Sequence, residues 1–218
     1  MEADVDCLKK NQRKESVIIW DADGVLFETF VLDTQFRWSQ NIKADLGIGG
    51  PLIKQIFSGD WEKVLRGEVE VLQHVETVFQ RNDFSLSAET FVAYWLEKDN
   101  RINEGVAHYL DLFPSCIGSN QPRVRAERFD EWFKGRVMQV FASSRMGGLM
   151  KPEPDYYRYI EHALGFSPQQ LCLIDDTQAN VDGAIKHGWQ AHHFVDTTGL
   201  SDFLENSNLL KKSADPTS

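Results

Sequence analysis

The chain has 218 residues, of which 42% are hydrophobic and 11% aromatic, a composition typical of a globular protein with a substantial core. Its formal net charge of −10, with scattered Lys and Arg residues, disfavours binding to nucleic acid or to an anionic membrane surface. An anionic ligand would therefore have to be held by local groups.

The ends of the chain and its cysteines indicate a cytoplasmic protein. Residues 1–15 are polar, without the apolar region of a secretory signal, and no stretch reaches the about 18 apolar residues that cross a bilayer. Cys7, Cys116 and Cys172 are far apart, so they indicate neither a disulfide framework nor a zinc site. We expect residues 1–15 and 211–218 to be flexible polar tails.

The most informative segment is a short apolar run that ends in two carboxylates. Val17–Trp20 predicts a buried strand, and Asp21-Ala22-Asp23-Gly24 follows it at once. Asp and Gly are common turn residues, so an acidic turn would account for this segment taken alone. Carboxylates beside an apolar core are costly unless a cation or hydrogen-bond donors stabilise them, which favours a metal site or a catalytic role.

The chain from residue 28 to residue 103 predicts a helical insertion. Apolar residues recur at helical spacing from Val64 to Phe79 with a break at Gly67, which indicates two helices. Ser87 is a suitable N-cap for a further helix that ends near residue 99. Strand signals are scarce throughout this segment, so we expect it to be entirely helical.

Three aromatic residues of the insertion have two possible roles. Tyr94 and Trp95 belong to one apolar helix face, and Trp61 precedes another helical run. Aromatic rings also stack on sugars, but their helical spacing makes packing inside the insertion the simpler interpretation.

After residue 103, predicted helices and strands alternate. The helices span residues 104–112, 122–135, 154–164, 180–187 and 201–212, and the strands span residues 115–118, 137–142, 171–174 and 191–195. This alternation is typical of a doubly wound α/β fold with a parallel, Rossmann-like sheet. The sequence thus predicts a discontinuous core, residues 16–27 and 104–200, with a helical cap, residues 28–103, inserted after the first strand.

The ends of the predicted strands bring distant polar residues to one edge of the sheet. Asp21, Ser119 and the pair Asp175-Asp176 each follow a strand, and ligands of doubly wound sheets bind at the carboxyl ends of strands. Each residue alone has an ordinary explanation as a turn or a helix cap. Their shared location predicts a site, and the insertion would cover that site as a lid.

These residues suit the transfer of a phosphoryl group from a phosphate monoester. If Asp23 begins protonated, one divalent metal and Lys151 balance the charges of Asp21, Asp175 and Asp176. Magnesium fits this site because it prefers hard oxygen ligands. Asp23 can protonate the leaving oxygen and later activate a water molecule.

Neutral donors and one cation complete the predicted site. Ser119 and nearby backbone amides can donate to phosphoryl oxygens, and Lys151, between Met150 and Pro152, provides a fixed positive charge. Asn120 is a candidate for the phosphate-binding group or a support for it, and Asn180 is a support. Arg145 is expected to be surface charge.

With these segments identified, the sequence resembles the haloacid dehalogenase-like hydrolase superfamily. The resemblance extends from about Ser16 to Val195 through four motifs in the family's order, IIWDADGVL, CIGSN, KPEPDYY and LIDDTQANVDGA. The position of the insertion resembles the C1 cap of subfamily I. The last two motifs look like the branch that holds sugar-phosphate phosphatases and the phosphatase domain of soluble epoxide hydrolases.

The resemblance implies a role for each residue of the site. By this likeness, Asp21 is the nucleophile and a magnesium ligand, and Asp23 is the general acid/base that also binds magnesium through its carbonyl. Asp176 is a further ligand, and Asp175 is an additional or outer ligand. Ser119 and Lys151 would bind the phosphoryl group.

The sequence therefore predicts a Mg²⁺-dependent phosphatase that hydrolyses a small phosphorylated metabolite, with a sugar phosphate favoured, through an aspartyl-phosphate intermediate. A sugar phosphomutase would share every core residue. A phosphoacceptor or binding protein without turnover is disfavoured by the large cap. A haloacid dehalogenase is disfavoured because those relatives generally lack the acid at the position of Asp23. The expected partner is the substrate, with no nucleic acid and no membrane, and the oligomeric state is not predicted.

Overall fold

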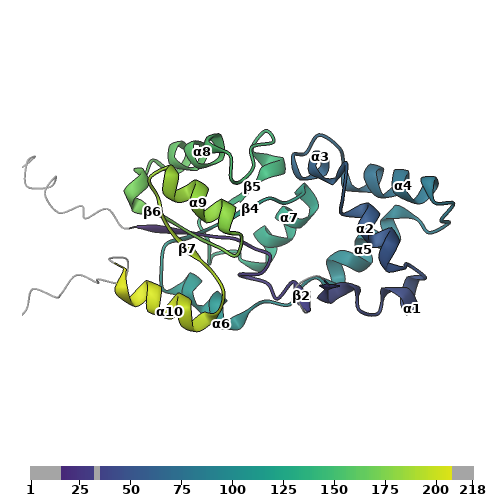
Figure 1. The fold of residues 1–218 in the computed structure, drawn as a ribbon, viewed down its shortest axis with the longest axis horizontal. Coiled ribbons are helices and arrows are strands. Elements are labelled where there is room, and N and C mark those ends of the chain that lie inside the picture. The colour runs from purple at the N-terminus through teal and green to yellow at the C-terminus, as the bar shows by residue number, and fades with distance from the viewer. Residues whose placement is uncertain (1–15, 32–34, 208–218) are drawn as a thin grey trace, which may run out of the picture.

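A computed structural model describes residues 16–31 and 35–207. The tails expected at residues 1–15 and 211–218, together with Cys7, lie outside the described residues. The described chain forms two lobes, a sheet flanked by helices and a smaller group of helices beside it (Figure 1).

Five parallel strands form the central sheet, in the order β5-β4-β1-β6-β7. They are β1 (Val17–Trp20), β4 (Ser115–Ser119), β5 (Val140–Ala142), β6 (Leu171–Asp175) and β7 (Gln190–His193). Ile19 in β1 is in register with Cys116 on one side and Leu173 on the other. The first strand is therefore central, and its carboxyl end lies between those of β4 and β6. The predicted doubly wound α/β fold is confirmed.

Helices cover both faces of the sheet (Figure 1). One face carries α6 (Glu104–Ala107), α7 (Arg123–Trp132) and α10 (Thr197–Asn206), and the other carries α8 (Pro154–Leu164) and α9 (Gln178–Lys186). Side chains of β1 alternate between the two faces, as expected for a strand. Ile18 and Trp20 pack in one apolar cluster with Phe129 of α7, and Ile19 packs in the other with Ile160 of α8.

The second lobe is built from the segment that follows β1. Its helices are α1 (Ile42–Leu46), α2 (Gly50–Ile56), α3 (Trp61–Leu65), α4 (Val71–Arg81) and α5 (Ala88–Lys98). They enclose a separate apolar cluster in which Ile48, Val75 and Phe91 are fully buried. The Ser87 side chain accepts a hydrogen bond from the Thr90 amide, so its prediction as the N-cap of α5 is confirmed.

Three expectations about secondary structure are wrong. The strand predicted over residues 137–142 begins only at Val140. The insertion is not entirely helical, because β2 (Phe30–Val31) and β3 (Gln35–Phe36) form an antiparallel ribbon, too short to leave an alternating pattern. The last helix begins at Thr197 rather than at Ser201, because the Asp196 side chain accepts a hydrogen bond from the Gly199 amide at 2.8 Å and caps it earlier. The predicted end at residue 212 is also wrong, because the helix ends at Asn206 and Ser207 is extended.

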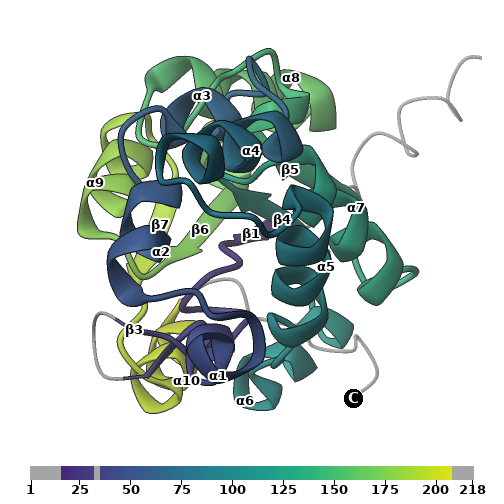
Figure 2. The ribbon, with the colours of Figure 1, turned by 90° about the vertical axis from the view of Figure 1, so that its right-hand side faces the viewer.

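The second lobe lies over the carboxyl ends of the strands. Figure 2, viewed from the side of this lobe, shows β1 and β4 framed by α2, α4 and α5. The Ser143 hydroxyl, just after β5, donates to the Leu65 carbonyl of α3 at 2.6 Å. Arg66 donates to the Gly148 carbonyl at 2.7 Å and pairs with Glu153 at 2.6 Å. These bonds hold α3 against the loops of the sheet.

Two of the three cysteines lie within the described ranges. Cys116 and Cys172 are buried and free, and burial raises the pKa of the Cys116 thiol to about 12. Both therefore serve as small apolar residues at neutral pH. None of the helices in the described chain is both long and apolar enough to cross a membrane.

We expect Gly118→Ala to destabilise the sheet, since a Cβ at this position of β4 would lie 2.4 Å from Ile19 Cγ2. Overpacking of this kind costs about 1–3 kcal/mol. Gly50→Ala is the matched control, because a Cβ there meets no atom within 4 Å and the residue begins α2. Urea unfolding measures both variants, and equal free energies of unfolding would contradict the tight contact between β4 and β1.

Candidate active site

The turn after β1 places Asp21 and Asp23 at the carboxyl edge of the sheet. The Asp21 amide donates to the Ile174 carbonyl of β6 at 2.9 Å, which continues the pairing of the two strands by one residue. Gly24 then adopts a left-handed conformation with φ 75°. A Cβ on Gly24 would lie 2.0 Å from Asp176 Oδ2, so glycine is needed for the turn to approach the end of β6.

Lys151 is the buried cation of this edge. Its ammonium lies 2.9 Å from Asp21 Oδ1 and 2.5 Å from Asp175 Oδ2, and it donates to the Gly118 carbonyl at 2.7 Å. Burial acts to lower the pKa of Lys151, but the Asp175 and Asp21 carboxylates outweigh it and raise the pKa above its ordinary value. The lysine is therefore charged and links the ends of β1, β4 and β6.

The Asn120 side chain positions Lys151. Its amide nitrogen donates to the Lys151 carbonyl and its amide oxygen accepts from the Lys151 backbone amide, both at 2.9 Å. Both polar atoms of the Asn120 side chain are thus engaged with the main chain. Of the two roles expected for Asn120, the geometry favours support of Lys151 over direct phosphate binding.

Three carboxylates at this edge form a group that can hold a metal ion. One oxygen from each of Asp21, Asp175 and Asp176 lies within 4.8 Å of the others. Asp176 is half-buried, and its carboxylate accepts a long hydrogen bond, 3.3 Å, from the Thr177 hydroxyl. Burial and the nearby Asp175 raise the pKa of Asp176. An all-oxygen set with excess negative charge suits Mg²⁺.

Asp175 is the most constrained member of this group. One of its oxygens accepts from the Thr177 amide at 2.9 Å and from Asn180 at 3.0 Å, and the other accepts from Lys151 and Asn180. The carboxylate is fully buried. These bonds suit a group that orients Lys151 and neutralises its charge better than one that binds a metal directly.

The electrostatics of Asp21 also favour a bound cation. Burial raises its pKa to about 7, with a further contribution from Asp175, against the lowering effects of Lys151 and a hydrogen bond with Ser119. Ser119 is the last residue of β4 and is buried beside Asp21. A carboxyl group with this pKa is protonated in part of the molecules near neutral pH, and a divalent cation that binds there would displace the proton.

Asp23 lies on the opposite side of the turn and has a different set of partners. Its carboxylate accepts from Thr29 at 2.9 Å, from Gln121 at 2.7 Å, and from Arg125 Nη1 at 2.7 and 2.8 Å. Burial acts to raise the pKa of Asp23, but the Arg125 guanidinium and these hydrogen bonds outweigh it and lower the pKa. The assumption that Asp23 begins protonated is therefore wrong for this arrangement.

Arg125 is a residue of the site that the sequence analysis did not find. It lies on α7 and is 3% exposed, and its second terminal nitrogen pairs with Asp99, at the end of α5, at 2.9 Å. It thereby joins the core, the turn after β1 and the second lobe. A signal existed, because Arg125 precedes Phe129 by one helical turn on the buried face of α7. Arg145, by contrast, pairs with the exposed Asp130 and is surface charge as predicted.

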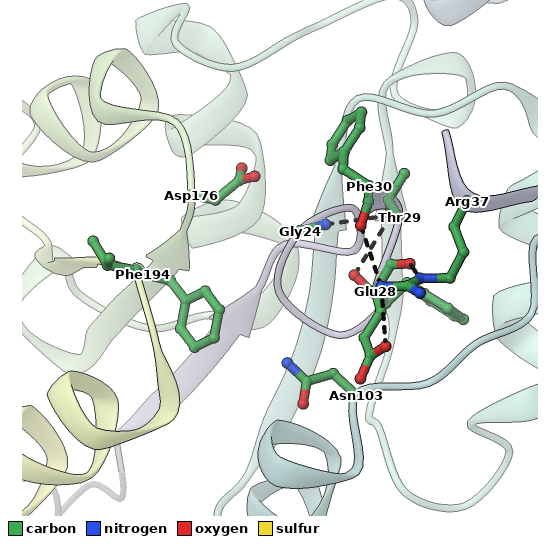
Figure 3. Close-up of a pocket in the computed structure, with 10 residues that line it drawn as sticks. Gly24, Glu28, Thr29, Phe30, Arg37, Asn103, Asp176 and Phe194 are labelled. Atoms are coloured by element: carbon green, nitrogen blue, oxygen red, sulfur yellow. Dashed lines mark hydrogen bonds and ion pairs between the residues drawn. The ribbon is translucent and has the colours of Figure 1, made fainter. Parts of the chain in front are cut away.

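Two hollows flank the turn between Asp21 and Thr29. The larger, of about 510 Å³, is open and lies beside Asp176. Figure 3 shows Asp176 and Phe194 on one side of it, with Gly24 and Glu28 on the other. The smaller, of about 220 Å³, lies on the side of Asp23, between the two lobes.

The lining of the smaller hollow shows which of the three aromatic residues of the insertion lie beside the site and which only pack. Trp61 and Trp95 belong to the apolar cluster of the second lobe and also line this hollow. Tyr94 packs against the same cluster, but its hydroxyl donates to Asp45 at 2.8 Å and it lines neither hollow. Packing is thus the role of all three, and two of them have a second face toward the site.

Comparison with known proteins shows which family the chain belongs to. The model of the haloacid dehalogenase-like hydrolases matches residues 16–188. No functionally curated protein matches the sequence significantly. Among solved structures, the HAD family enzyme bt-2542 from Bacteroides thetaiotaomicron, in complex with magnesium and inorganic phosphate, is 17% identical with a TM-score of 0.68, over 82% of this chain and 93% of that one.

Two further structures have the same fold. A predicted HAD-like family hydrolase from Porphyromonas gingivalis is 19% identical with a TM-score of 0.68, over 88% of this chain and 98% of that one. The L-2-haloacid dehalogenase from Xanthobacter autotrophicus, with chloropropionic acid covalently bound, is 17% identical with a TM-score of 0.59, over 89% and 84%. With the family match over most of its length, the chain belongs to the haloacid dehalogenase-like hydrolases.

Proposed function

We propose that the protein is a Mg²⁺-dependent phosphatase that hydrolyses a small phosphate monoester through an aspartyl-phosphate intermediate. The observation that carries this proposal is the arrangement of Asp21 and Asp23 on the two sides of one turn. Asp21 faces the buried ammonium of Lys151 and two further carboxylates, whereas Asp23 faces the hollow between the lobes. A nucleophile and a proton-transfer group are thus held side by side with separate surroundings.

The residues divide the reaction between them. Asp21 attacks the phosphorus, the bond from phosphorus to the alcohol oxygen breaks, and Asp23 delivers a proton to that oxygen. Water then attacks the aspartyl phosphate while Asp23 takes up a proton, and inorganic phosphate leaves with Asp21 restored. Ser119 and Lys151 donate hydrogen bonds to the phosphoryl oxygens. Asp23 is ionised in this structure, which is its state for activating water, and it takes up a proton when the anionic substrate binds.

The residues present fit a magnesium ion beside Asp21. Asp21, Asp176 and the carbonyl of Asp23 would hold it, with Asp175 kept back by its bonds to Lys151 and Asn180. When bound, the ion offsets the negative charge that the phosphoryl group brings to these acids. The structural neighbour from Bacteroides thetaiotaomicron, whose complex contains magnesium and inorganic phosphate, supports this proposal.

Haloacid dehalogenases share the fold, so the fold alone does not select the reaction. Asp23 favours phosphoryl transfer, because an alkoxide leaving group needs a proton and a halide does not. A sugar phosphomutase would use the same groups, and its product would be an isomerised sugar phosphate in place of free phosphate.

We further infer a cytoplasmic protein whose ligand is a small molecule and which binds neither nucleic acid nor membrane. The free buried thiols and the net charge of −10 support this inference. The site holds an anion by local groups, chiefly Lys151 and a metal. The alcohol part of the substrate, for which the sequence analysis favoured a sugar, depends on the hollow beside Asp23.

Asp21→Asn should lower the rate of phosphate release by at least about a thousandfold, because an amide is not a competent nucleophile. The measurement is inorganic phosphate release from acetyl phosphate with Mg²⁺, and chelation of the metal should abolish the wild-type activity. Asp182→Asn, on the exposed side of α9, is the matched control and should retain full activity. A loss below about tenfold for Asp21→Asn would contradict its role.

Mg²⁺ affinity should increase as the pH rises through about 7. The pKa of Asp21 is raised to about 7, so below that pH a proton occupies the carboxylate and must leave before the cation binds. The affinity then falls by up to about tenfold for each pH unit below 7. Isothermal titration calorimetry between about pH 6 and pH 8, in buffers of different ionisation enthalpy, measures the affinity and the released proton. The affinity of Asp21→Asn should vary less with pH, and a wild-type affinity independent of pH would contradict this account.

A further inference from the structure

The hollow beside Asp23 has an aromatic wall. Five rings line it, namely Phe36, Trp38, Phe57, Trp61 and Trp95. Trp38 and Trp95 are at most 4% exposed, whereas Phe36, Phe57 and Trp61 are half-buried. All five come from the second lobe, and the polar residues opposite them come mainly from the core.

The rings support one another in a fixed arrangement. Phe57 contacts Trp61 edge to face at 4.7 Å between ring centroids, and Trp95 edge to face at 5.5 Å. Phe36 lies 5.2 Å from Phe57 and stacks on Trp38 at 5.6 Å. Edge-to-face and offset contacts of this kind leave ring faces available to a further flat group.

The polar groups of the hollow are already paired with one another. Arg125 bridges the carboxylates of Asp23 and Asp99, and Asp99 also accepts from the Trp95 indole at 3.1 Å. Gln121 donates to Asp23 through its nitrogen and accepts from Arg125 through its oxygen at 3.1 Å. A sugar would therefore have to break these bonds or leave its own hydroxyl groups unpaired, and both are unfavourable.

The position of the hollow assigns it to one part of the substrate. Asp23, which delivers the proton to the alcohol oxygen, forms part of its wall, whereas Asp176 borders the other hollow. The leaving alcohol thus lies among the rings while the phosphoryl group lies against Lys151. A cavity of about 150 Å³ can hold benzene, so about 220 Å³ accommodates one substituted ring.

We propose that the substrate is the phosphate monoester of a neutral alcohol that carries a single aromatic ring, and that this ring stacks in the pocket formed by Phe36, Trp38, Phe57, Trp61 and Trp95. The proposal rests on the proposed phosphatase function and names its substrate class. It replaces the sugar favoured by the sequence analysis.

The test compares esters whose leaving alcohols have similar basicity, so that chemical reactivity does not decide the result. Benzyl phosphate, glucose 6-phosphate and glycerol 1-phosphate meet this condition, and acetyl phosphate, a small acyl phosphate, serves as a substrate that does not reach the rings. We expect kcat/KM for benzyl phosphate to exceed that for the two polyol phosphates by about tenfold or more, through burial of the ring.

Two matched variants connect this preference to the pocket. Trp61→Leu should lower kcat/KM for benzyl phosphate by about five- to tenfold and change that for acetyl phosphate by less than about twofold. Tyr94→Leu replaces an aromatic residue of the same lobe that does not line the pocket, and should leave both values within about twofold of wild type. Retained hydrolysis of acetyl phosphate shows that each variant is folded.

The possible outcomes separate the two proposals. Hydrolysis of all four compounds with no preference for benzyl phosphate, or an equal loss for benzyl phosphate and acetyl phosphate in Trp61→Leu, would overturn the substrate class and leave the phosphatase function standing. Absence of hydrolysis of all three esters and of acetyl phosphate would overturn the phosphatase function and with it this inference. A preference for benzyl phosphate that Trp61→Leu removes supports both.

Discussion

The site depends on the contacts that the buried ammonium group of Lys151 makes. This group neutralises Asp21 and Asp175, bonds to the carbonyl of Gly118, and so connects the ends of three adjacent strands. Without a cation there, carboxylates at the ends of β1 and β6 would repel one another inside a buried edge. The Asn120 side-chain amide bonds to both the carbonyl and the amide of the Lys151 main chain, so it fixes the position of the ammonium group together with the charged partners.

The carboxylate on the other side of the turn also needs a cation. Asp23 is half-buried and is paired with Arg125, which also neutralises Asp99 of the second lobe. Each of the two acids of the turn thus has its own buried cation. The pKa of Asp21 is raised and that of Asp23 is lowered, so two carboxylates separated by one residue acquire different chemistry from their surroundings.

Parallel strands explain why much of the core of the site could be predicted from the sequence. An apolar run followed by a polar residue marks a strand end, and all strand ends of such a sheet meet at one edge, so Asp21, Ser119 and Asp175 follow from local patterns. Arg125 could not be found in this way, because its role depends on how α7 meets the second lobe. The aromatic rings are difficult to interpret for a related reason. Trp61 and Trp95 both pack in the apolar cluster of the second lobe and line the pocket, and their helical spacing in the sequence is the same for either role. A helical pattern identifies a buried face, but it does not say which buried residues border a cavity.

Covalent capture of the phosphoryl group on Asp21 tests the central claim most directly. A phosphate ester that the protein hydrolyses would be mixed with the protein and Mg²⁺, and the reaction would be stopped with acid within one turnover. The peptide that contains Asp21 and Asp23 would then be analysed by mass spectrometry. The account predicts one added phosphoryl group, located on Asp21. Release of phosphate with this peptide unmodified throughout the turnover, or a phosphoryl group located on a different residue, would contradict it.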